Sequence, residues 1–135
     1  MKRVTGIGGI FFKCEDAKSM KDWYGKHLGI ETDQYGGHFK WREDTDKEKR
    51  CITSWSTFSK ESDYFAPSKK DFMFNYRVEN LVELLKILQE EGVTIVGEIQ
   101  EFEYGKFGWI LDPEGNKIEL WEPIDKPLLD YHEGK

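Results

Sequence analysis

Two stretches of the chain repeat the same order of apolar and polar positions. Residues 7–12 form an apolar run rich in β-formers, and Asp16, a good helix N-cap, follows shortly after. Apolar residues then recur at helical spacing until Gly29, a residue type that commonly ends helices. The pattern predicts a strand and then an amphipathic helix, with its apolar positions at Ala17, Met20, Trp23, Tyr24 and Leu28.

The second copy begins with apolar and aromatic residues at alternating positions over residues 71–78. Asn80 then caps a predicted helix, with Glu83 three residues later, which is close to a capping box. Gly92 ends this helix, whose apolar stripe is formed by Leu81, Leu84, Leu85 and Leu88. Asp16 and Asn80 are therefore equivalent positions at an offset of 64 residues.

Three short β-like segments follow each predicted helix, separated by turn residues. The first set lies at residues 30–35, 38–43 and 51–58, with turns at 36–37 and 44–49. The second set lies at residues 93–100, 106–111 and 117–121, with a tight hairpin connection at 112–116. We therefore predict one domain over residues 1–135, with module one at about 4–58, a linker at 59–70, module two at about 71–122 and a loosely held tail at 123–135.

Composition and charge exclude several classes of protein. The net charge is −6, whereas a nucleic-acid binder needs a basic face, and the short apolar runs are far below the ~20 residues that span a bilayer. The N-terminus lacks the features of a signal peptide, so we expect a cytoplasmic protein that binds neither nucleic acid nor membrane. Cys14 and Cys51 lack metal-binding spacing, and we expect both to be small buried residues.

Two segments resemble a known family. Residues 16–24 followed by Leu28-Gly29 are similar to the first helix of the vicinal oxygen chelate superfamily, the glyoxalase, bleomycin-resistance and extradiol dioxygenase group. Residues 107–121, with their Asp-Pro-Glu-Gly-Asn turn, are similar to its closing hairpin, and the resemblance covers roughly residues 4–122. It implies an α+β fold in which two βαβββ modules form a cupped mixed β-sheet with helices on the outer face.

Members of this family commonly hold a divalent metal with a His, Gln or Glu on the first strand of each module and a Glu on the last. Counting back seven residues from each helix cap reaches Gly9 and Met73, neither of which suits such an ion. The closing Glu of module two is present as Glu119, and its counterpart in module one falls near Trp55. We therefore predict no metal site and no cofactor, and glyoxalase I activity is not expected, because a catalytic metal needs about three protein ligands.

Strand alternation predicts which residues face the cup. The candidate pocket combines aromatic, apolar and charged side chains: Phe11, Lys13, His38, Trp55, Met73, Arg77 and Trp109. Glu119 is the candidate catalytic residue, although it can equally pair with Arg77 or face water. Whether His38 or Trp41 lines the cup depends on the hairpin register around residues 44–49, which the sequence leaves open.

These residues support three hypotheses. The first is metal-independent binding of a small amphipathic or aromatic molecule in the cup. The second is a divergent enzyme of the superfamily, such as a lyase, isomerase or dioxygenase-like protein, using Glu119 and also His38. The third is an interaction module whose aromatic residues close the cup or bury an interface. A homodimer is the family expectation, and the linker allows the modules to pair within one chain or to exchange between two.

Overall fold

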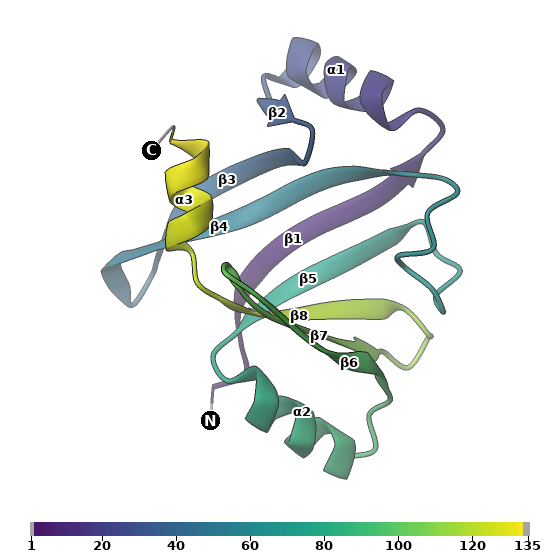
Figure 1. Cartoon of the computed structure of the whole chain (residues 1–135), viewed down its shortest axis with the longest axis vertical. Coiled ribbons are helices and arrows are strands. Elements are labelled where there is room, and N and C mark those ends of the chain that lie inside the picture. The colour runs from purple at the N-terminus through teal and green to yellow at the C-terminus, as the bar shows by residue number, and fades with distance from the viewer. Residues whose placement is uncertain (1, 134–135) are drawn as a thin grey trace.

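The chain forms two consecutive βαβββ modules that join in one sheet, in a computed structural model that describes residues 2–133 (Figure 1). Module one consists of β1 (Val4–Cys14), α1 (Ala17–Leu28), β2 (Thr32–Asp33), β3 (Gly36–Glu43) and β4 (Asp46–Ser59). Module two consists of β5 (Phe72–Val78), α2 (Leu81–Glu90), β6 (Ile95–Phe102), β7 (Gly105–Leu111) and β8 (Lys117–Pro123). A third helix, α3 (Lys126–His132), follows.

The eight strands form one mixed, open sheet in the order β2-β3-β4-β1-β5-β8-β7-β6. Each module pairs its first and last strands in parallel, and the modules meet where β1 and β5 pair antiparallel, with Gly9 opposite Asn75. The two halves are therefore related by an approximate twofold axis through the centre of the sheet. The α+β fold predicted from the repeat is confirmed.

The predicted caps begin and end the first two helices. Asp16 accepts a hydrogen bond from the Ser19 amide, and Asn80 accepts one from the Glu83 amide. Gly29 ends α1 with φ of 70°, in the left-handed region that glycine adopts without a steric cost. The local sequence thus sets the same strand-to-helix turn twice, which places α1 and α2 equivalently on the sheet.

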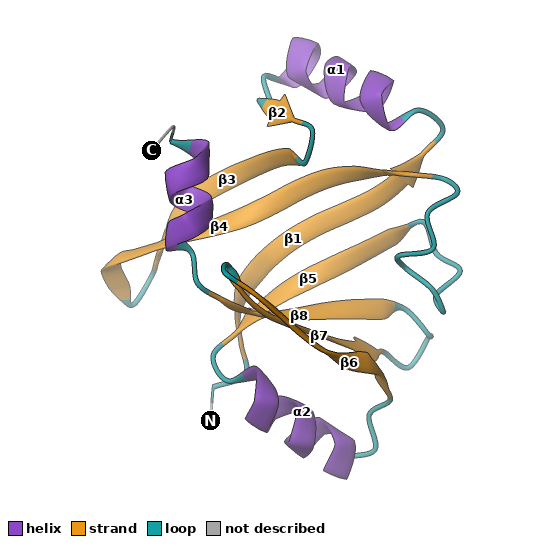
Figure 2. Ribbon diagram, viewed as in Figure 1, coloured by secondary structure: helices purple, strands orange, loops and turns teal. Residues whose placement is uncertain are grey.

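Helices α1 and α2 cover the convex face of the sheet at opposite ends (Figure 2). Under α2, a buried apolar cluster joins the helix to β5 and β8; its members are Val78, Leu81, Leu84, Leu85 and Leu120. Under α1 the packing is aromatic, because Trp55 of β4 contacts Tyr24 with ring centroids 4.9 Å apart. Within residues 2–133, no helix is both long enough and apolar enough to cross a membrane.

Three segments differ from the sequence prediction. The charged residues 44–49 were expected to form a turn, but the turn contracts to Asp44 and Thr45, and β4 begins at Asp46. The linker is more than a polar connection between the modules, because Phe65 within it is fully buried. The tail was expected to be loosely held, but its residues Lys126–His132 form α3, which packs Leu129 against Ile52 and Trp121 on the concave side of the sheet. Residues 134–135 of the predicted tail lie outside the described residues.

Candidate functional site

A buried carboxylate lies at the centre of the concave face. Glu119 of β8 is 2% exposed and pairs with Asn75 of β5 on one side and with Trp109 of β7 on the other. Strand pairing continues this row from Asn75 to Gly9 of β1 and to Ser54 of β4. The site is therefore built from five neighbouring strands contributed by both modules.

Three donors hold the Glu119 side chain. The Tyr64 hydroxyl and the Trp109 indole donate to Oε2 over 2.5 and 2.9 Å, and Asn75 Nδ2 donates to Oε1 over 2.7 Å. Charge-assisted hydrogen bonds of this kind compensate for the removal of a carboxylate from water. Burial, reinforced by the negative charge of Glu119, raises the pKa of Tyr64, so this phenol stays protonated and donates.

The segment between the modules forms one wall of the cup. Tyr64 lies over the site, and Phe65 packs against Met73 and Trp109 in a fully buried cluster. Lys117 donates to the Tyr64 carbonyl over 2.7 Å, and its ammonium lies 5.3 Å from the centroid of the Tyr64 ring. Burial lowers the pKa of this lysine. These contacts fix the tyrosine that bonds Glu119.

The C-terminal helix closes the opposite side. Asp125, just before α3, accepts two hydrogen bonds from the Arg77 guanidinium, over 2.7 and 2.6 Å. Arg77 is 1% exposed, also donates to the Ile52 carbonyl over 3.1 Å, and lies 5.2 Å from the centroid of the Trp121 ring. A buried arginine with these partners ties α3 to the floor of the cup.

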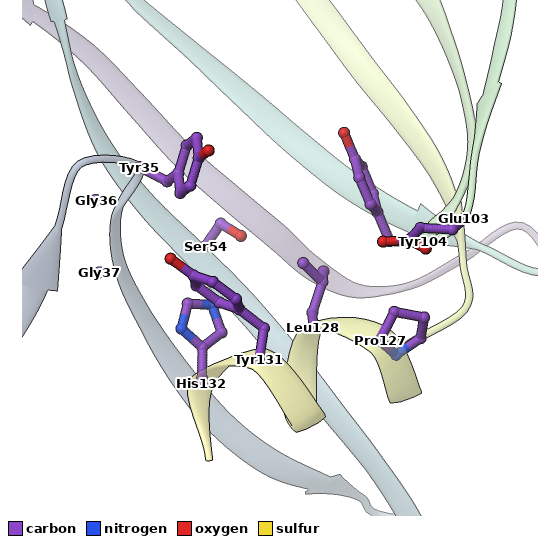
Figure 3. Close-up of a pocket in the computed structure, with 10 residues that line it drawn as sticks. All are labelled: Tyr35, Gly36, Gly37, Ser54, Glu103, Tyr104, Pro127, Leu128, Tyr131 and His132. Carbon is purple, nitrogen blue, oxygen red and sulfur yellow. The ribbon is translucent and has the colours of Figure 1, made fainter. Parts of the chain in front are cut away.

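Two adjoining cavities lie on the concave side of the sheet. The inner one has a volume of about 160 Å³, and its lining includes Phe11, Asn75 and Glu119. The outer one, of about 430 Å³, opens beside α3 (Figure 3). The two share Ser54, Tyr104 and Leu128 in their linings, so they adjoin each other. In Figure 3, Tyr35, Tyr131 and His132 lie on one side of the outer cavity and Glu103 and Tyr104 on the other.

A pair of histidines lies at the rim of the cup, beside the outer cavity. His38 of β3 and His132 of α3 stack with ring centroids 3.5 Å apart and an interplanar angle of 20°. Burial lowers the pKa of both imidazoles, and for His38 the neighbouring His132 adds to the effect. Next to them, Glu133 bonds Arg50 and Lys40, and these partners lower the pKa of its carboxyl to about 2.

The structure brings most of the predicted pocket residues to the concave side, in different roles. Phe11 and Glu119 line the inner cavity, whereas Met73 and Trp109 fill the floor with Phe65. Lys13 lies 5.4 Å from the centroid of the Phe65 ring, beyond the cavity. The Arg77 side chain forms a salt bridge with Asp125. The hairpin register pairs His38 with Ser54, which places His38 on the concave side, while Trp41 pairs with Cys51 and bonds Thr53.

Trp55 does not lie in the cup, contrary to the prediction. It packs against Phe12 and Tyr24 beneath α1, while its neighbours Ser54 and Ser56 line the inner cavity. Phe11 pairs with Ser56 as Asn75 pairs with Glu119, so the module-one counterpart of Glu119 is Ser56. A single-residue difference between the modules places Trp55 on the opposite face.

Several site residues were not predicted from the sequence. Tyr64 lies in the predicted linker and Tyr131 in the predicted tail, and neither is among the predicted pocket residues. The available signals were the aromatic pair Tyr64-Phe65 within a polar stretch and the apolar pair Leu128-Leu129 after Pro127. Apolar pairs in otherwise polar segments indicate docking onto a core.

The residues present do not fit the metal that the family commonly holds. Gly9 has no side chain to donate, and Met73 is buried in the cluster with Phe65. Three hydrogen-bond donors are already directed at Glu119. Throughout residues 2–133, no three His, Cys, Asp or Glu side chains lie close enough together to hold a metal ion. No step of the chemistry is therefore assigned to a metal.

Solved structures with this fold include several enzymes. Methylmalonyl-CoA epimerase from Mycobacterium tuberculosis is 19% identical, with a TM-score of 0.63 over 96% of this chain and 95% of that one. A variant of the Streptomyces coelicolor epimerase, in complex with 2-nitronate-propionyl-CoA, is 13% identical, with a TM-score of 0.65 over 89% and 98%. A Legionella pneumophila protein described as an NAD-dependent benzaldehyde dehydrogenase is 11% identical, with a TM-score of 0.55 over 86% and 98%. At these identities the likeness establishes the fold alone.

Comparison with curated protein sequences finds no relative. A family model, in contrast, matches residues 6–120, nearly the whole of both modules. Its description is the Glyoxalase/Bleomycin resistance protein/Dioxygenase superfamily, in agreement with the resemblance of the first helix and the closing hairpin. The chain belongs to this superfamily.

Proposed function

We propose that this protein binds a small amphipathic or aromatic molecule in its cup without a metal ion. The observation that carries the proposal is the pair of adjoining cavities, one of about 430 Å³ beside α3 and one of about 160 Å³ beside Glu119. Apolar and aromatic walls with a few convergent polar groups are typical of small-molecule sites. A module whose cup is closed by its own side chains would lack an opening of this size.

Metal independence rests on the surroundings of Glu119. Three donors from Tyr64, Trp109 and Asn75 already occupy most of the acceptor capacity of Glu119, and Gly9 and Met73 offer a metal ion no further ligand. A single carboxylate does not hold a catalytic metal, which needs about three protein ligands. The site therefore favours an organic ligand over an ion.

The test is a thermal-shift screen of aromatic and amphipathic compounds, followed by calorimetric titration of the hits, with and without EDTA. We expect binding that EDTA leaves unchanged. Glu119→Gln is the site variant, and Glu101→Gln, an exposed carboxylate on β6, is the matched control. Tight, stoichiometric binding of a divalent metal that is lost in Glu119→Gln would overturn the proposal.

A second candidate is a divergent enzyme that uses Glu119 for proton transfer, in the lyase or isomerase class. The neighbouring structures described as methylmalonyl-CoA epimerases favour it, as does a carboxylate that lines a cavity and bonds a phenol. Incubation of the protein with methylmalonyl-CoA in D2O tests the idea by mass spectrometry. Deuterium incorporation that disappears in Glu119→Gln supports it, and incorporation unchanged in that variant removes Glu119 from the mechanism.

Two further expectations remain predictions from the sequence. A homodimer is tested by light scattering of the purified chain, where the mass of a single chain would contradict it. A cytoplasmic location is tested by microscopy of the tagged protein, where an extracellular or membrane signal would contradict it.

A further inference from the structure

The inner cavity contains a buried acceptor without a partner. Asn75 is 2% exposed and directs Nδ2 to Glu119, because a carboxylate oxygen can only accept. This orientation leaves Asn75 Oδ1 with no hydrogen-bond partner among the described residues. Oδ1 lies against Gly8, and both Asn75 and Gly8 line the inner cavity, so this buried acceptor lies beside the cavity wall. Buried acceptors of this kind need a donor, and a bound molecule can supply it.

Glu119 offers a second open acceptor beside the first. Its Oε2 receives two donors, whereas Oε1 receives Asn75 Nδ2. A carboxylate oxygen accepts about two hydrogen bonds, so Oε1 can take another. The two open acceptors belong to side chains that bond each other.

The charged side chains of the cavities also favour a ligand that carries hydrogen-bond donors. Their titratable side chains are Glu119 in the inner cavity and Glu103, Tyr104, Tyr35, Tyr131 and His132 towards the opening. Among residues 2–133, no Lys or Arg lines either cavity. The nearby cations are engaged elsewhere, Arg77 with Asp125 and Lys117 with the Tyr64 carbonyl. The lining therefore carries the negative charges of Glu119 and Glu103 and no charge from Lys or Arg.

Aromatic faces complete the site. Phe11, Phe107 and Trp121 line the inner cavity, and Phe107 and Trp121 stack with an interplanar angle of 6°. Aromatic rings attract cations through their negative faces and pack flat apolar groups equally well. The chamber thus combines acceptors, negative charge and π surfaces.

We infer that the ligand is a small aromatic or apolar amine, bound as its ammonium, whose N–H groups donate to Asn75 Oδ1 and Glu119 Oε1. The inference rests on the proposed function and names its ligand class. The ammonium supplies several donors and a positive charge, and its apolar body extends past Tyr104 and Leu128 into the outer cavity. An acyl-CoA fits poorly, because its phosphates need cations that the lining lacks.

The test is titration of the ¹⁵N-labelled protein with three matched probes, benzylamine, benzyl alcohol and benzoate, and with propionyl-CoA. The Trp109 indole and Asn75 side-chain signals report whether binding is in the cup. We expect benzylamine to bind at least about tenfold more tightly than benzyl alcohol, and benzoate to bind weakest. Glu119→Gln should abolish the preference for the amine, and Glu101→Gln should preserve it.

Glu103→Gln keeps the test decisive if Glu119→Gln does not fold, because Glu103 lies at the exposed opening. This substitution should weaken the binding of benzylamine about two- to threefold, as expected for one screened charge, and leave the binding of benzyl alcohol unchanged. If the three ring compounds bind equally, or if benzoate or propionyl-CoA binds more tightly than benzylamine, the inference of an amine ligand is overturned while the proposed function stands. If no probe perturbs the cup signals, both are overturned.

Discussion

Tyr64, from the segment between the modules, donates its hydroxyl hydrogen to Oε2 of Glu119 on the last strand. The contact joins a loop residue to the one buried carboxylate in the central row of the cup, 55 residues away. It makes the connecting segment part of the site.

The first prediction removes this donor. Tyr64→Phe keeps the ring that packs on Phe58 but leaves the carboxylate short of one hydrogen bond. We expect the free energy of unfolding to fall by about 1.5–3 kcal/mol, the range for hydrogen bonds to charged groups. Urea denaturation measures it, with Tyr35→Phe, an exposed tyrosine, as the control. A loss in Tyr64→Phe no larger than in the control would show that the bond contributes little.

The second prediction concerns the attachment of α3. Asp125→Asn leaves the Arg77 guanidinium buried without its counter-charge, which should cost about 3–5 kcal/mol in unfolding free energy. Lys126→Ala breaks the exposed Lys126–Asp130 pair and should change stability by less than about 0.5 kcal/mol. Equal effects of the two changes in urea denaturation would contradict a structural role for the buried pair.

The third prediction is pH dependence at the rim. The pKa of His38 and of His132 is lowered on folding, so the unfolded segment binds protons first as the pH falls. The docking of α3 is therefore fully stable above the unfolded pKa of about 6.5 and weakens below it. Glu133, with its pKa near 2, stays ionised throughout this range.

Hydrogen exchange of the α3 amides at pH 7.5 and 5.5, corrected for the intrinsic rate, measures the effect. Protection should fall at pH 5.5 in the native chain and less so in His38→Gln. His27→Gln, on α1 beside Trp23, serves as the control and should behave like the native chain. Protection that is the same at both pH values would contradict the prediction.

The fourth prediction probes the inner cavity. A Cβ at Gly8 would clash with Asn75 Oδ1 and lie 3.0 Å from the Trp121 ring. Gly8→Ala should therefore cost about 1–3 kcal/mol of stability and abolish ligand binding. Gly25→Ala, in α1 with its nearest neighbour at 3.4 Å, should be neutral or stabilising by up to about 1 kcal/mol. Retained binding in Gly8→Ala would show that the ligand does not enter the inner cavity.

The sequence determined the fold more completely than the site. Caps at Asp16 and Asn80, a fixed offset between them and a hairpin at 112–116 are local signals, and the structure follows them. No local signal determines the face of the sheet on which Trp55 lies. That face depends on the loop lengths between α1 and β4, because one residue more or less moves each side chain of the strand to the opposite face.

The walls of the cup were harder still to predict. Tyr64 and Tyr131 lie in segments that are too short to show a periodic pattern of apolar and polar residues. Their partners are far away in the chain. Contacts of this kind depend on how the finished sheet curves, so periodicity carries no information about them.

The strand order has a consequence for association between molecules. Joining β1 to β5 pairs the two strands that a single module would leave open, and only β2 and β6 remain at the edges of the described sheet. β2 is two residues long, and β6 is interrupted by a register shift around Gly97 and carries Glu98 and Glu101. Short, irregular and charged edges are poor templates for further strands, so the duplication also protects the chain against edge-to-edge aggregation.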